Sequence, residues 1–139
     1  MGNKEFKEEL WYLYGLRLEK LIPGKRLYFG FRKYFTKGTG VEVSMNFDTA
    51  KSPHIIGWYH THPGEKNITP SSTDNATMRS WVKAAYKTYL CGIRSGDSEA
   101  VYCYYLGGIS KDKTTIVNKS KIKFSLFGPL FLGVLEIYK

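Results

Sequence analysis

Hydrophobic and polar residues alternate along most of this chain, which is the pattern of β-strands. Extended runs of this kind cover Leu10–Leu21 and Arg26–Phe35, with Pro23–Gly24 as the turn between them. The run Ile55–His62 is almost wholly apolar and is typical of a buried strand. Further strand-like runs are Thr39–Met45, Thr88–Ile93, Ala100–Leu106, Thr114–Val117 and Lys121–Leu126.

One segment has helical periodicity instead. Met78, Trp81, Val82 and Ala85 recur at helical spacing, so we expect a helix over residues 72–87 with Ser71 or Ser72 as its N-cap. Many strands with one clear helix predict an α+β or α/β fold, in which helices cover a sheet. At 139 residues the chain is long enough for one domain with a real core, and we assign residues 1–139 to that domain.

Two histidines stand at the end of the run 55–62. Alternate residues of a strand share a face, so His60 and His62 point the same way and Thr61 points to the other face. Pro63 ends the strand directly after them. Two imidazoles on one face make half of a metal site, and Asp74 can supply a third ligand. Three such ligands leave a fourth position of a tetrahedral Zn²⁺ open, as in catalytic zinc sites.

The same residues also have purely structural interpretations. An acid such as Asp74 near a helix N-terminus is favourable without any metal, and Ser71 is a good N-cap. Taken singly, each of these residues is explained by its structural role. Taken together with His60-x-His62-Pro63 just upstream, the residues favour a metal site.

His60-x-His62-Pro63 followed by Ser71-x-x-Asp74 resembles the motif of the JAMM (MPN+, or JAB) zinc metalloproteases, in particular prokaryotic members. The segment 38–43 resembles a stretch that precedes the motif in that family. The loop between Pro63 and Ser71 holds seven residues, one more than is common there. The resemblance implies a mixed β-sheet with flanking helices.

The resemblance also implies chemistry. One Zn²⁺ per chain, held by His60, His62 and Asp74, would activate a water as nucleophile for hydrolysis of a peptide or isopeptide bond. Ser71 would donate a hydrogen bond to the oxyanion. A distant Glu would serve as general base, and Glu8 matches the position of the family's Glu relative to a later glycine. Glu9 and Glu42 remain alternatives.

Ubiquitin or a ubiquitin-like protein is the substrate class that the resemblance implies, with E1-like or E2-like pathway proteins as possible partners. Two other functions stay open. One is a non-catalytic scaffold with the same motif, and the other is a basic nucleic-acid-associated domain of the RadC type. Zinc deaminases are excluded because they need His-x-Glu and a Cys pair, whereas His62 occupies the Glu position.

The net charge of the chain bears on the kind of partner that it binds. The formal net charge is +9, and lysines crowd the last third of the chain. Scattered lysines usually only solvate a surface, and the functional interpretation that we prefer is an acidic protein partner. No nucleic-acid-binding motif is present, so we do not expect nucleic acid as a partner.

Cys91 and Cys103 are expected as reduced, buried thiols that could face each other across a hairpin. With no apolar run long enough to span a bilayer and no signal peptide, we expect a cytoplasmic protein. The apolar run 124–135 predicts a buried strand, a short helix or a partner-facing surface.

Overall fold

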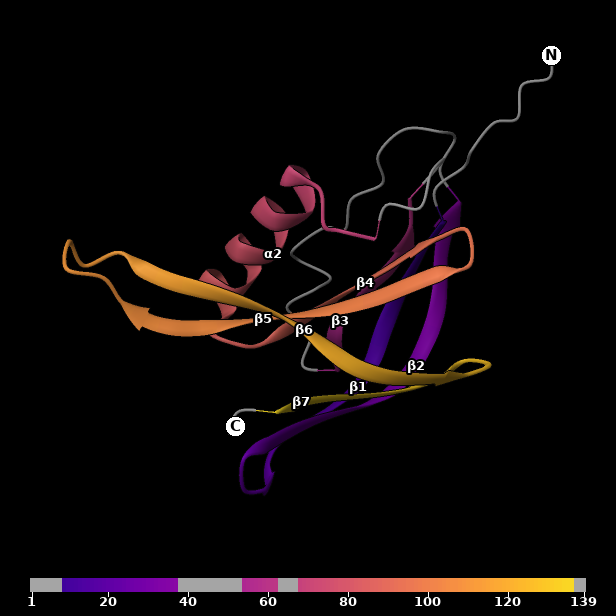
Figure 1. Ribbon diagram of the computed structural model, residues 1–139, viewed down its shortest axis with the longest axis horizontal. Helices are drawn as coiled ribbons and strands as arrows, with labels where there is room; N and C mark the ends of the chain where they lie inside the picture. The colour runs from indigo at the N-terminus through magenta and orange to yellow at the C-terminus, as the bar shows by residue number, and fades with distance from the viewer. Residues whose placement is uncertain (1–8, 38–53, 63–67, 137–139) are drawn as a thin grey trace, which may run out of the picture.

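Seven strands close into a barrel in this computed structural model, which describes residues 9–37, 54–62 and 68–136 (Figure 1). Around the barrel the order is β1-β2-β7-β6-β5-β4-β3, and β3 pairs with β1 to close the ring. The elements are β1 (Glu9–Ile22), β2 (Lys25–Lys37), β3 (Ile55–Thr61), α2 (Ser72–Ala85), β4 (Tyr89–Ser95), β5 (Ser98–Ile109), β6 (Thr115–Phe127) and β7 (Leu130–Glu136).

The expected fold class is therefore wrong. A mixed sheet with flanking helices would leave two sheet edges, whereas here every strand has a neighbour on both sides. Within the described residues α2 is the only helix, and it covers one side of the barrel. The physical reason is the length of the hairpin strands. β1 and β2, of 14 and 13 residues, form one hairpin that pairs with β3 on one side and with β7 on the other, and this joins the two ends of the sheet.

Most of the individual strands lie where the alternation predicts them. The turn at residues 23–24, the strands on either side of it and the strand carrying the histidines are all present. The two short runs expected at residues 114–117 and 121–126 form a single strand, β6. The run expected at residues 39–45 falls outside the described ranges.

One pairing is parallel and explains the position of the helix. β3 pairs with β4 in parallel, while the other pairs are antiparallel. Parallel neighbours need a crossover connection, and α2 lies on it. The helix packs on the outside of the barrel against β4, β5 and β6 (Figure 1). The N-terminus of α2 follows from the end of β3, where the histidines are.

Two hydrophobic clusters result from this arrangement. The first lies between α2 and the sheet and contains Met78, Trp81, Trp58 and Cys91 among others. The second contains residues from all seven strands, such as Leu13, Tyr28 and Phe131, and fills the barrel interior. Strands β3 and β4 contribute to both clusters, which explains why residues 55–60 are all buried. The sequences of β3 and β4 are nearly continuous apolar runs because both faces of these strands are covered.

Gly57 permits the close approach of β3 and β4. A Cβ atom at this position would lie 2.2 Å from the carbonyl oxygen of Leu90 on β4. No side chain fits at that distance, so any other residue would push the two strands apart. The parallel register that pairs Trp58 with Cys91 and His60 with Ile93 depends on this contact.

The apolar run 124–135 forms the end of β6, a turn and β7. Its residues alternate. On β7, Phe131 and Leu135 enter the barrel interior, while Leu130 and Leu132 face outward. The outward residues continue across paired strands as an exposed apolar face. Its members are Leu16, Phe29, Phe31, Phe127, Leu130 and Leu132. Within the described part of the chain, no helix is both long and apolar enough to cross a membrane.

Candidate metal centre

The end of β3 positions the two histidines. His60 is the cross-strand partner of Leu10 on β1 and of Ile93 on β4, so its backbone is fixed from both sides. His62 follows the last strand residue, and its backbone N–H donates to the carbonyl of Arg94 at 2.8 Å. The ring of His60 stacks on Trp58 with centroids 4.4 Å apart. Both imidazoles therefore face the side on which α2 lies.

The start of α2 positions the carboxylate. Ser71 is the N-cap, and its Oγ accepts a hydrogen bond from the backbone N–H of Asp74 at 3.0 Å. In return, Oδ2 of Asp74 accepts from the backbone N–H of Ser71 at 3.0 Å. This reciprocal pair is a capping box, which satisfies two of the unpaired donors at a helix start. The structural interpretations of Ser71 and Asp74 thus hold, and the capping box also locks the carboxylate in place.

The two imidazoles and the carboxylate meet at one point. Nε2 of His60 lies 3.1 Å from Nε2 of His62, and Oδ2 of Asp74 lies 3.2 Å and 3.1 Å from these two atoms. A tetrahedral ion with bonds of 2.0–2.1 Å holds its ligand atoms about 3.3–3.4 Å apart. The triangle is therefore within a few tenths of an ångström of the size that Zn²⁺ requires.

A fourth donor, Cys91, lies next to this triangle. Its Sγ and one ligand atom each of His60 and Asp74 lie within 4.8 Å of one another, and all three residues are buried. This group could hold a metal ion. From the sequence we expected Cys91 only as a buried thiol, because Cys91 and Cys103 are spaced too widely for a Cys-x-x-Cys site. The parallel register of β4 on β3 brings Cys91 beside Trp58, whose ring stacks on His60.

The cysteines are otherwise as expected, with one correction. Both thiols are free and buried. They do not face each other, however, because Cys91 belongs to the cluster under α2 and Cys103 to the barrel interior. In the β4–β5 hairpin Cys91 pairs with Tyr102, and Cys103 pairs with Leu90. Cys103 therefore shares a face of the sheet with Leu90. Because Cys91 follows Leu90 directly, the two thiols lie on opposite faces.

The ionisation of the donors differs. Burial alone would raise the pKa of Asp74, but hydrogen bonds from His60 and His62 and from the Ser71 backbone hold it well below its usual range. Burial raises the pKa of the Cys91 thiol well above its usual value, and the nearby Asp74 charge adds to this. Asp74 is thus present as the carboxylate that a metal needs, whereas Cys91 is a neutral thiol.

Exposure distinguishes the two sides of the site. The side chain of His60 is 2% exposed and that of His62 is 11% exposed, so the site reaches solvent on the His62 side. Nδ1 of His60 is buried and has no hydrogen-bond partner among the described residues. Such an unpaired polar atom costs roughly 1–3 kcal/mol. A buried polar atom without a partner therefore needs an explanation, such as a bound ion or water or a role in the chemistry of the site.

The expected general base is only partly covered by the structure. Glu8 and Glu42 fall outside the described ranges. Glu9 is the first residue of β1, and its backbone N–H donates to Oγ1 of Thr61 at 2.8 Å. Leu10 packs on the helix side with Trp58, so the adjacent Glu9 has its side chain on the other face. Glu9 therefore points away from the imidazoles.

Replacing Cys91 by alanine tests whether the thiol is a ligand. We expect Cys91→Ala to keep about one zinc per chain, because two imidazoles and a carboxylate complete a catalytic-type set without it. Elemental analysis of the purified variant measures this. Loss of zinc from Cys91→Ala together with its retention in His62→Ala would instead make His60, Asp74 and Cys91 the ligand set.

Comparison with models of protein families and with curated proteins found no match for this chain.

Proposed function

We propose that this chain is a zinc-dependent hydrolase of amide bonds, a JAMM-type peptidase or isopeptidase carried on a closed barrel. The observation that supports this most is the triangle of His60, His62 and Asp74, whose donor atoms lie 3.1–3.2 Å apart. The capping box and the His60–Trp58 stack hold these donors in place. A preorganised site of this kind is what catalysis requires.

We assign the metal to His60, His62 and Asp74 rather than to the group that includes Cys91. His62 lies on the solvent side, where a substrate can enter, whereas Cys91 is fully buried. When bound in this set, zinc would supply Lewis-acid polarisation of the scissile carbonyl and a water of lowered pKa.

The remaining roles fall to residues near the end of β3 and the start of α2. Ser71 is exposed, and its Oγ already accepts from the Asp74 backbone, so its O–H remains able to donate to a developing oxyanion. Glu8 is proposed as the general base that takes a proton from water and delivers it to the leaving amine. The orientation of Glu9 supports Glu8 over its neighbour.

We propose a ubiquitin-like protein with an acidic surface as the substrate. Lys119, Lys121 and Lys123 alternate along β6 and so share one face of the sheet, next to α2. Lys119 also reaches Asn75 in the first turn of α2, with Nζ 3.4 Å from Oδ1. A positive face that begins beside the metal centre would attract and orient an acidic substrate.

Hydrolysis of a defined substrate tests the proposal. Zinc-loaded protein is incubated with ubiquitin-like proteins whose C-terminus is joined to a lysine side chain or to a fused peptide, and products are measured by mass spectrometry. We expect cleavage directly after the ubiquitin-like C-terminus, which stops with a chelator, returns with zinc and is absent in His62→Ala. Cleavage that persists in His62→Ala would contradict the assignment.

A further inference from the structure

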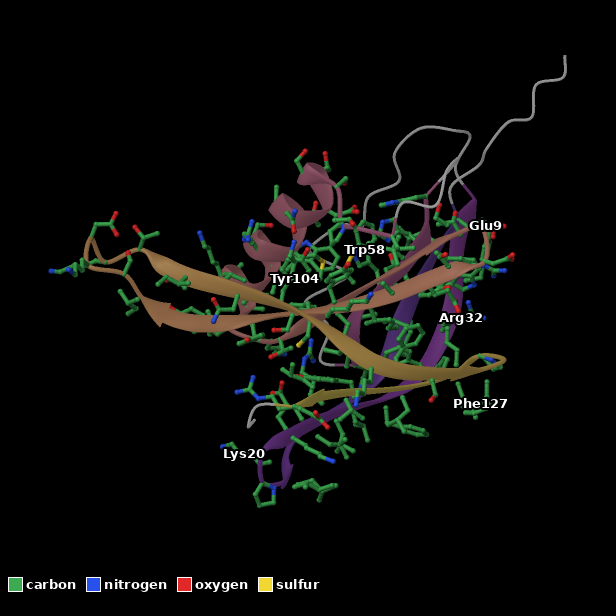
Figure 2. All side chains as sticks on the ribbon, viewed as in Figure 1. Glu9, Lys20, Arg32, Trp58, Tyr104 and Phe127 are labelled. Carbon is green, nitrogen blue, oxygen red and sulfur yellow. The ribbon has the colours of Figure 1, made fainter. Side chains whose placement is uncertain are left out.

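A second concave site lies at the other end of the barrel from the metal centre. It is a pocket of about 280 Å³ lined by the end of β1, the start of β2, the C-terminus of α2 and the end of β5. Asp74 and Tyr86 stand near opposite ends of α2, which separates the two sites by roughly 18 Å along the helix axis. Figure 2 shows Lys20, one of the lining residues, at the opposite end of the molecule from Glu9.

Four cationic side chains line this pocket. They are Arg17, Lys20, Arg26 and Lys87, and the one acid among the lining residues is Glu19. The Oε2 atom of Glu19 accepts a hydrogen bond from the Tyr28 hydroxyl at 2.8 Å. The pocket thus carries a formal excess of three positive charges, which is four cations less one carboxylate.

Arg17 is held rigidly at the back of this pocket. Its Nε donates to the carbonyl of Thr88 at 2.7 Å, and its Nη2 donates to the carbonyl of Ile55 at 2.8 Å. Its guanidinium also lies over the ring of Tyr89, 4.9 Å from the centroid. Arg26 is oriented in a similar way over the ring of Tyr105. These contacts fix both guanidinium groups without using a carboxylate.

Among the described residues, the Glu19 carboxylate is the acid that acts on Arg17, and its charge raises the pKa of that guanidinium. Arg17, Arg26 and Lys87 are all half-buried, and one carboxylate does not balance these cations, so holding their charges together is costly. Desolvation lowers the pKa of Arg17 from its usual value, yet an arginine stays charged in proteins. A preformed, positively charged hollow of this kind has the features of an anion site, since a bound anion would offset the cost of holding these charges together.

We propose that this pocket binds a phosphate-bearing small molecule. Planar guanidinium groups match phosphate oxygens, and the pocket has room for more than one phosphate. Tyr86 and Leu106 form its apolar rim and can contact an attached organic group such as a nucleoside. The proposal does not depend on the chemistry of the metal centre.

Calorimetric titration with inorganic pyrophosphate and with ADP at 0.15 M NaCl tests this. For the wild type we expect saturable binding with a Kd below about 1 mM. Arg26→Gln and Lys87→Gln should each weaken it by about tenfold, the effect of losing one charge-assisted contact. Tighter binding of ADP than of pyrophosphate would identify a nucleotide, and equal affinity would identify the phosphates alone as the bound group.

Lys111→Gln and Lys113→Gln are the matched controls, because both lysines are exposed at the β5–β6 hairpin and each change also removes one positive charge. They should leave the affinity within about twofold of the wild type. Chelation of a metal by pyrophosphate is the same in all these proteins, so differences between them report the pocket. No saturable binding, or equal losses in the controls, would overturn the proposal.

Discussion

Glu8→Gln is expected to lower kcat by about 10²- to 10⁴-fold while leaving the zinc content unchanged. Glutamine has the size and shape of glutamate but cannot accept a proton, so only the acid–base step is lost. The measurement is single-substrate kinetics on the cleaved ubiquitin-like fusion, with elemental analysis of the same preparation. Loss of activity with zinc retained separates a general base from a metal ligand.

Glu9→Gln is the matched control, since the same change is made at the next residue, the first of β1, on the face that points away from His60. It should leave kcat within about twofold, because surface changes away from the site have small effects. Glu42→Gln tests the remaining candidate in the same assay. A large loss in Glu9→Gln or Glu42→Gln, with Glu8→Gln active, would reassign the base.

Zinc should raise the thermal stability of the metal-free protein strongly. At a free zinc concentration 1,000 times the Kd, a ligand that binds only the folded state adds about 4.1 kcal/mol to the free energy of unfolding. For a chain of this size that corresponds to a rise in Tm of roughly 8–16 °C. Asp74→Asn should abolish the rise, because an amide is a much poorer zinc ligand than a carboxylate. Differential scanning calorimetry with and without zinc measures both.

The fold of Asp74→Asn itself is expected to persist. Asparagine can still accept the Ser71 N–H through its amide oxygen, and the Asp74 backbone N–H still donates to Ser71 Oγ, so the capping box remains. Asp97→Asn, in the exposed β4–β5 turn, is the control for the charge change and should keep the full zinc-induced shift. An unchanged shift in Asp74→Asn would remove Asp74 from the ligand set.

Local features of the site were accessible from the sequence alone. Strand alternation places His60 and His62 on one face, and Ser71 with Asp74 is recognisable as a helix start. Both inferences need only neighbouring residues. The structure adds that the strand end and the helix start meet, with donor atoms 3.1–3.2 Å apart.

Long-range features were not accessible in this way. Closure of the barrel depends on pairing Leu10 with His60 and Phe29 with Leu132, and no local pattern specifies such partners. The resemblance to the JAMM motif suggested a sheet with flanking helices, and this was wrong because the long β1–β2 hairpin completes a ring instead. Cys91 was missed as a donor for the same reason, since only the parallel register of β4 on β3 brings it near Asp74.

The most direct test of the metal centre is the zinc content of protein purified without a histidine tag, compared with His62→Ala and Asp74→Ala. A catalytic-type site predicts about one zinc per wild-type chain and none in either variant. Wild-type protein that contains no zinc and fails to bind it when it is supplied would contradict the account, as would variants that keep the full amount.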